Sequence, residues 1–242
     1  MFHKTKTEGV CRILAIDIDG IIRDLEAPYL CLTGDETLNR YDHPGWTEWF
    51  YGLSEDNMWD LMTNAPIIRS GLELYRKLAS ISFFDALFFL TAQGKNCEYP
   101  TRDFMRDNVF DENMIVLSEY DGQLSDVLGS NIPRIVDGCV DVALVAKSSY
   151  KACLLRAVAN EACIQYGLSP EKVKVGLIDD CLRTQKSLDS NMLKFFATQR
   201  LTRDAFEIRG TDILDISKVV FSNDTNIQNE LIYKEIIKPF GG

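Results

Sequence analysis

Two carboxylates separated by one residue are the first side chains along the chain whose type and spacing could do chemistry. Asp17 and Asp19 follow a short apolar run at residues 12–16, and Gly20 gives the backbone freedom to turn there. If the chain turns, one carboxylate could attack phosphorus as a nucleophile while the other protonates the leaving oxygen. The same four-residue pattern also occurs in solvated surface turns, so the assignment depends on partners elsewhere.

A second pair of acids, Asp179 and Asp180, ends the apolar run at residues 172–178. Adjacent carboxylates at a strand end repel each other unless a cation is present, and oxygen ligands suit Mg²⁺. We therefore expect these two acids to bind Mg²⁺. The alternative is a loop start with solvated acids.

Thr91 ends a third apolar run, which begins at Phe83. Its hydroxyl, together with the backbone N–H of a neighbour such as Ala92, could hold a phosphate oxygen. The alternative is a threonine that simply ends a strand.

Phosphoryl transfer also needs a cation that offsets charge on the nucleophile and on the phosphate oxygens. Lys147 directly follows an apolar run, and Lys151 lies one helical turn later. We favour Lys147, because its position at a strand end is more constrained, and keep Lys151 as the alternative. Either lysine could instead be a solvated residue at a helix start.

An alternation of strands and helices must position these motifs. The apolar runs predict strands at residues 12–16, 83–90, 113–118, 140–146 and 172–178, and helical patterns cover residues 71–79 and 148–166. Ser148 and Ser149 are candidate caps for the long helix, and Gly167 suits its end. The pattern predicts an α/β fold with a Rossmann-like parallel sheet flanked by helices, in which ligands bind at the carboxyl ends of strands.

Residues 25–68 interrupt this alternation and hold all three tryptophans of the chain. We expect a small, mostly helical cap there, inserted after the first strand, with residues 1–24 and 69–242 forming the core. Trp46 and Trp49 could stack on a nucleobase, or they could fill a small core that joins the cap to the domain. We assign no chemistry to residues 203–242.

Composition narrows the function further. The 242 residues are 46% apolar and 26% charged, which is typical of a globular protein, and the formal net charge of −10 makes long nucleic acid an unlikely partner. Seven dispersed cysteines and two histidines exclude a disulfide framework and a histidine-based metal site or triad. The N-terminus lacks the apolar core of a signal peptide, and no apolar run could span a bilayer. We expect a cytoplasmic protein without a membrane partner.

Four segments in this order resemble the haloacid dehalogenase (HAD) superfamily of phosphohydrolases across roughly residues 12–200: ILAIDIDGIIRD, LFFLTAQGKN, VALVAKSSYK and VKVGLIDD. The resemblance implies a HAD fold, Mg²⁺ as cofactor and an aspartyl-phosphate intermediate. It implies that Asp17 is the nucleophile and a metal ligand, and that Asp19 is the general acid/base with its backbone carbonyl on the metal. Thr91 would bind the phosphate, and Lys147 or Lys151 would be the charge-stabilising lysine. Asp179 would be a further metal ligand, with Asp180 beside it.

Two subgroups of the superfamily have similar segments, and they imply different substrates. DIDGIIRDLE, with its acid at Asp24, is similar to the opening of the 5′(3′)-deoxyribonucleotidases, whereas VAKSSYKACLL and VKVGLIDDCLRT look more like the phosphatase domain of polynucleotide kinases. We expect a phosphatase for a small phosphorylated metabolite, with a deoxyribonucleoside monophosphate as the first candidate. The alternatives are a 3′-phosphatase on nucleic-acid ends, with a basic groove at Arg102 and Arg106, and a catalytically silent binding protein.

Overall fold

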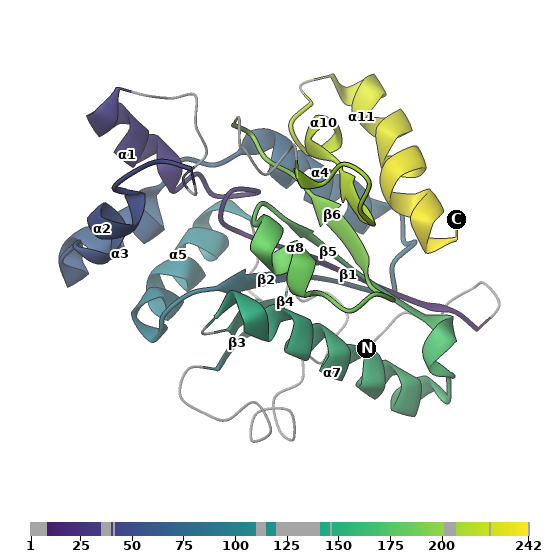
Figure 1. The fold of residues 1–242 in the computed structure, drawn as a ribbon. Coiled ribbons are helices and arrows are strands. Elements are labelled where there is room, and N and C mark those ends of the chain that lie inside the picture. The colour runs from purple at the N-terminus through teal and green to yellow at the C-terminus, as the bar shows by residue number, and fades with distance from the viewer. Residues whose placement is uncertain are drawn as a thin grey trace.

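A parallel sheet forms the centre of the molecule, described here from a computed structural model (Figure 1). The structure describes residues 9–34, 40, 42–109, 115–119, 141–145, 147–200, 207–222 and 224–241. In these residues the strands are β1 (Cys11–Ile16), β2 (Ala86–Ala92), β3 (Ile115–Glu119), β4 (Asp141–Val145), β5 (Val173–Asp179), β6 (Leu193–Phe196) and β7 (Ile213–Asp215). They pair in the order β3-β4-β2-β1-β5-β6-β7, and every pairing is parallel.

Helices cover both faces of this sheet, as Figure 1 shows. Their bounds are α1 (Glu26–Thr33), α2 (Trp46–Tyr51), α3 (Glu55–Asn64), α4 (Arg69–Ser80), α5 (Glu98–Asn108), α7 (Ser148–Tyr166), α8 (Leu182–Ser187), α10 (Ser217–Val220) and α11 (Thr225–Leu231). Short 3₁₀ or π turns occur at η1 (Lys95–Cys97), η2 (Pro170–Lys172), η3 (Ile232–Ile237) and η4 (Lys238–Phe240).

Alternating side chains of β1 belong to two separate cores, because successive residues of a strand point to opposite faces. Leu14 and Ile16 pack with α4, α5, α10 and η3 on one face. Ile13 and Ala15 pack with α7 on the other face. β1 is buried on both faces and pairs with β2 on one edge and β5 on the other, so its carboxyl end has a defined position.

The helices α1, α2 and α3 lie in the segment between β1 and α4, and we call this segment the insert. They surround a small apolar core of their own, which includes Leu30, Trp46 and Met62. Two backbone hydrogen bonds join the chain segments that enter and leave the insert. They run from Asp24 N to Pro66 O and from Ile68 N to Ile22 O, each at 2.8 Å. The predicted fold class, a parallel sheet flanked by helices with a helical insert after the first strand, is therefore confirmed.

The structure corrects several details of the predicted elements. Strand β2 extends to Ala92, so Thr91 lies inside the strand and does not follow it. Helix α7 begins at Ser148 with Lys147 at the N-cap, and no side chain caps it. Strands β6 and β7 and the helices after them were not predicted, because they are short and lack a clear apolar period. The prediction that the N-terminus is not a signal peptide concerns mainly residues 1–8, which lie outside the described residues. Among the described helices, none has the length and apolar character to cross a bilayer.

Candidate active site

Three buried carboxylates meet where β1 and β5 end. These strands run in parallel register, with Ile16 opposite Ile178, so the residues that follow them are neighbours. The backbone N–H of Asp17 donates to Ile178 O at 2.8 Å. Carboxylate oxygens of Asp17, Asp179 and Asp180 lie within 4.8 Å of one another, and all three side chains are buried. Asp17 and both acids of the second motif therefore form one cluster at the strand ends, whereas the Asp19 carboxylate lies outside it.

A buried lysine joins two of these carboxylates. Lys151 Nζ lies 2.8 Å from Asp17 Oδ2 and 2.6 Å from Asp179 Oδ2, and its side chain is 2% exposed. Lys147 is exposed at the start of α7, and its ammonium lies 5.9 Å from the Tyr150 ring centroid. The structure thus places Lys151 against the carboxylates, and not Lys147, which the sequence analysis favoured. Lys147 has extended backbone angles at the N-cap, whereas Lys151 lies inside the first turns of α7, beside the buried Ala152.

Burial raises the pKa of two of the clustered acids. The pKa of Asp17 is raised to about 7 by burial, against the lowering effect of the Lys151 ammonium, and Asp179 and Asp19 raise it further. Burial likewise raises the pKa of Asp180 well above its usual range, although Arg40 opposes the shift. For Lys151, burial lowers the pKa, but Asp17 and Asp179 outweigh it and raise the pKa. Three carboxylates around the Lys151 ammonium and the Arg40 guanidinium leave one excess negative charge, so the cluster favours either a proton or a further cation.

Asp19 faces a different network from Asp17. Its Oδ1 accepts from Arg23 Nε at 2.7 Å, and its Oδ2 accepts from Gln93 Nε2 and, at 3.3 Å, from Thr91 Oγ1. Burial raises the pKa of Asp19, but Arg23 chiefly, with Arg40 and Gln93, outweighs this and leaves the pKa below its usual value. Asp19 is therefore held as a carboxylate, the form that accepts a proton.

Arg23 and Gln93 were missed in the sequence analysis. Arg23 is fully buried and also donates to Met62 O at 2.8 Å and to Thr101 Oγ1 at 3.1 Å, so it ties Asp19 to α3 and α5. Gln93 lies two residues after Thr91, on the same side of an extended chain, and this spacing was the available signal. Arg23 gave no comparable signal, because an arginine four residues after an aspartate is common on surfaces.

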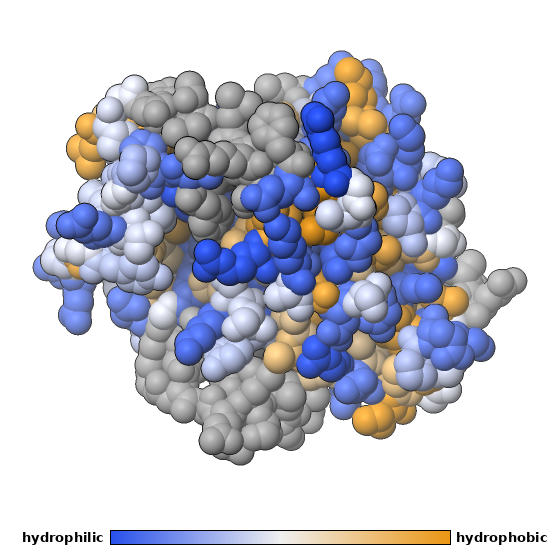
Figure 2. Space-filling view, in the orientation of Figure 1, coloured by the Kyte–Doolittle hydropathy of each residue, from blue (hydrophilic) through white to orange (hydrophobic). Residues whose placement is uncertain are grey.

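A cavity of about 970 Å³ opens beside Asp19, between the insert and the sheet. The insert contributes apolar and aromatic side chains: Leu25, Trp46, Phe50, Tyr51, Met58 and Met62. The core contributes polar and charged ones, among them Gln93 and Lys147, and the backbone region of Ala92. Trp46 lines the cavity, whereas Trp49 packs against Tyr29 and Trp46. Figure 2 shows hydrophilic side chains gathered over α8, beside the insert.

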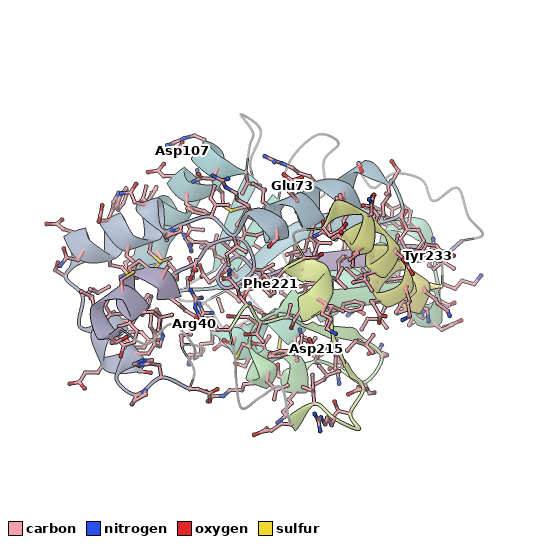
Figure 3. All side chains as sticks on the ribbon, turned by 90° about the horizontal axis from the view of Figure 1, so that it is seen from above. Arg40, Glu73, Asp107, Asp215, Phe221 and Tyr233 are labelled. Atoms are coloured by element: carbon pink, nitrogen blue, oxygen red, sulfur yellow. The ribbon has the colours of Figure 1, made fainter. Side chains whose placement is uncertain are left out.

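Arg40 connects the insert to the carboxylate cluster. Its Nη2 lies 3.1 Å from Asp180 and 3.4 Å from the backbone carbonyl of Asp19, and its side chain is buried. Figure 3 shows Arg40 at the junction of the insert helices and the core. Asp180 and the backbone carbonyl of Asp19 were predicted to bind the metal, so a guanidinium charge occupies the neighbourhood where that cation would bind. The hard oxygen donors of Asp17, Asp179 and Asp180 fit Mg²⁺.

Gly20 makes this arrangement possible. Its φ is +89°, and a Cβ at this position would lie 2.0 Å from Asp180 Oδ2. The turn after Asp19 and the close approach of Asp180 therefore both require glycine.

The two basic residues that would have marked a nucleic-acid groove are engaged with acids of their own helix: Arg102 with Glu98, and Arg106 with Asp103 and Asp107.

Comparisons with known proteins give limited information. No protein-family model matches the chain, and no curated protein sequence matches it. A similar solved structure is that of a HAD family hydrolase from Deinococcus radiodurans R1 with bound phosphate and sodium. The two chains are 13% identical, the alignment covers 96% of this chain and 98% of that one, and the TM-score is 0.44. At these values the likeness carries no weight for function, which must be argued from the residues of this chain.

Proposed function

We propose that this chain is a phosphomonoester hydrolase in which Asp17 is the nucleophile and a nucleotide-like small molecule is the substrate. The observation that supports this most is the buried Lys151 ammonium between Asp17 and Asp179, with Asp180 beside them. Such a cluster is costly to bury and has no evident use in packing, so we infer that it serves chemistry.

In the first half of the reaction, a carboxylate oxygen of Asp17 attacks the phosphorus atom of the substrate. The ester P–O bond breaks, an aspartyl-phosphate forms, and the leaving oxygen takes a proton. Lys151 stays close to Asp17 Oδ2 and offsets charge on the attacking group and on the phosphoryl oxygens. The Thr91 hydroxyl donates to Asp19 in this structure, and it can donate to a phosphate oxygen instead when substrate binds.

In the second half, water attacks the aspartyl-phosphate, inorganic phosphate leaves, and Asp17 is regenerated. Asp19 accepts the proton of that water, and the network of Arg23, Gln93 and Thr91 suits this step because it holds Asp19 as a carboxylate. To protonate the leaving oxygen in the first half, Asp19 must first take up a proton from solvent, which requires its carboxylate to give up part of this network and turn toward the cavity that it lines.

Mg²⁺ would be held by Asp17, Asp179, Asp180 and the carbonyl of Asp19. When bound, it supplies positive charge that neutralises the carboxylates and the phosphoryl oxygens. The chain must then move the Arg40 guanidinium away from Asp180 and from the Asp19 carbonyl.

The cavity supports a substrate with a flat ring. Trp46, Phe50 and Tyr51 line its insert side, and aromatic side chains favour the faces of nucleobases. Trp46 is only 9% exposed and stacks on Phe50, whereas Tyr51 is 79% exposed. Tyr51 is therefore the aromatic side chain with most surface to offer a ligand.

The test is the initial rate of phosphate release from a panel of phosphomonoesters with Mg²⁺. The panel contains ribo- and deoxyribonucleoside 5′- and 3′-monophosphates, sugar phosphates and a 3′-phosphorylated oligonucleotide. We expect a nucleoside monophosphate to be preferred, and Asp17→Asn to lower its rate by at least about a thousandfold. Full activity of Asp17→Asn would reject the nucleophile. An inactive panel with normal Mg²⁺ binding would favour a binding protein.

A further inference from the structure

Resting on the proposed function, we propose that the cavity takes a phosphomonoester with two additional features, an aromatic ring and a second phosphate group. The ring lies against the insert, and the second phosphate lies against three cations of the core, Lys147, Arg183 and Lys186. We call these three residues the cationic wall. A nucleoside that carries two separate phosphate groups has this chemistry.

The two sides of the cavity differ in character. The insert side is mainly apolar and aromatic, with Trp46 and Phe50 stacked at 5.4 Å and 23° and Tyr51 exposed beside them. Its polar lining residues are Arg40, Asp42 and Thr47. On the opposite side, the first residue before α7 and two residues of α8 bring ammonium and guanidinium groups to the same cavity. A ligand that contacts both sides must therefore be apolar or aromatic at one part and anionic at another.

The charge of the cationic wall contrasts with that of the whole protein. Lys186 forms an ion pair with Glu207 at 2.6 Å, and Asp19, the other acid on this side, is paired with Arg23 at 2.7 Å. Lys147 and Arg183 therefore leave two positive charges on this side. Within the described residues, Lys147 and Arg183 form no ion pair with a carboxylate. The complete chain carries a net charge of −10. Two unneutralised cations beside one cavity in so acidic a protein indicate an anionic ligand group there.

The cationic wall lies close to the reacting centre along the chain. Lys147 is the N-cap of α7 and lies four residues before Lys151, the residue that contacts Asp17. Arg183 follows Asp180 by three residues. This placement suits a second phosphate that lies within a few bonds of the phosphate that Asp17 attacks, as two phosphates on one sugar do.

The size of the cavity agrees with a ligand of this kind. Its volume of about 970 Å³ is at the upper end of the roughly 300–1,000 Å³ typical of small-molecule sites. A phosphate alone would leave most of it empty. The overall negative charge disfavours a long nucleic acid, so we assign the second phosphate to a small molecule and not to a phosphodiester chain.

The experiment compares kcat/KM for a nucleoside 5′-monophosphate, the matching 3′,5′-bisphosphate and a sugar bisphosphate without a ring. We expect the nucleoside bisphosphate to exceed each of the others at least about tenfold, because a charge-assisted contact distinguishes it from the first and ring contacts from the second. Neutralising two cations in Lys147→Gln/Arg183→Gln should bring the ratio of bisphosphate to monophosphate close to one. Lys172→Gln, an exposed cation before the amino end of β5, is the control and should keep the wild-type ratio.

The outcomes separate this inference from the proposed function. Equal turnover of monophosphate and bisphosphate would overturn the cationic wall and leave the phosphatase intact. A 3′-phosphorylated dinucleotide that outperforms the bisphosphate would overturn the small-molecule assignment in favour of nucleic-acid ends. If no compound is hydrolysed, calorimetric titration with the bisphosphate and the monophosphate still decides: tighter bisphosphate binding that the double variant loses supports the wall, and equal affinities reject it.

Discussion

At the carboxyl ends of β1 and β5 the charged side chains are buried and in contact, whereas on the cationic wall of the cavity they are exposed. Lys151 and Lys147 illustrate the contrast, since they lie one turn apart near the start of the same helix. Lys151 contacts two carboxylates and is 2% exposed, while Lys147 projects at the helix start and lines the cavity. The same residue type therefore has two different energetic roles.

This contrast separates chemistry from substrate selection. A buried ion cluster holds its geometry without rearrangement, which is what an attacking carboxylate and its counter-charge require. Exposed cations keep their hydration and mobility, so they can adapt to a ligand at little cost to folding. We expect substitutions in the buried cluster to affect stability and turnover, and substitutions on the wall to affect substrate preference alone.

The largest effect should come from Lys151→Met. It leaves Asp17 and Asp179 facing each other without their ammonium, and loss of one partner from a buried charge cluster costs about 3–5 kcal/mol. Urea unfolding at about pH 8 measures this, since wild-type Lys151, whose pKa is raised, remains charged there. Lys147→Met is the matched control and should change the free energy of unfolding by less than about 0.5 kcal/mol. Equal losses for both variants would contradict the comparison.

Gly20→Ala should have the next largest effect. Both Gly20 and Gly34 have positive φ, +89° and +73°, so an alanine at either position costs about 1–2 kcal/mol of backbone strain. At Gly34 a Cβ meets nothing within 4 Å, whereas at Gly20 it lies 2.0 Å from Asp180 Oδ2. Gly34→Ala should therefore only destabilise, while Gly20→Ala should also weaken Mg²⁺ binding roughly tenfold or more. Unchanged Mg²⁺ affinity in Gly20→Ala would remove Asp180 from the metal ligands.

The affinity for Mg²⁺ should depend on pH through Asp17. The raised pKa of about 7 means that Asp17 holds a proton below that pH in the metal-free protein, and a bound cation must displace it. Through Asp17 alone the affinity should therefore fall by about tenfold for each pH unit below 7, and the raised pKa of Asp180 should make the fall steeper. Calorimetry across this range in two buffers of different protonation enthalpy measures both affinity and proton release. A constant affinity without proton release would contradict the assignment.

The smallest effect should come from an exposed ion pair. Arg156 donates to both carboxylate oxygens of Asp189, at 2.7 and 2.8 Å, and both side chains are substantially exposed. Because water screens such pairs, Arg156→Ala should cost no more than about 1 kcal/mol. A loss as large as that of Lys151→Met would mean that burial does not distinguish the two kinds of charge pair.

Local patterns were sufficient to predict the sheet and the acids at its edge. Asp17 and Asp179 each follow a buried apolar run, and parallel strands bring such positions together whatever the intervening chain does. The position of the insert was predictable for a related reason, since the segment interrupts an otherwise regular alternation of strands and helices. Strands β6 and β7 are too short to show a period, and they were missed.

Contacts that depend on tertiary packing could not be predicted. The choice between Lys147 and Lys151 depends on where α7 begins and which side of it faces β1, and one residue of shift would alter the outcome. Arg23 looks like a surface residue in the sequence, yet it is fully buried against Asp19. Arg40 reaches Asp180 across 140 positions, a contact with no local signal.

The most direct test of the account is to trap the covalent intermediate. The protein is mixed with Mg²⁺ and the best substrate of the panel, quenched in acid within one turnover, digested and examined by mass spectrometry. We predict one phosphoryl group on the peptide that contains Asp17 in the wild type, and none in Asp17→Asn, which should also release no phosphate. Turnover without a phosphorylated Asp17 peptide, or an Asp17→Asn variant that works at the wild-type rate, would contradict it.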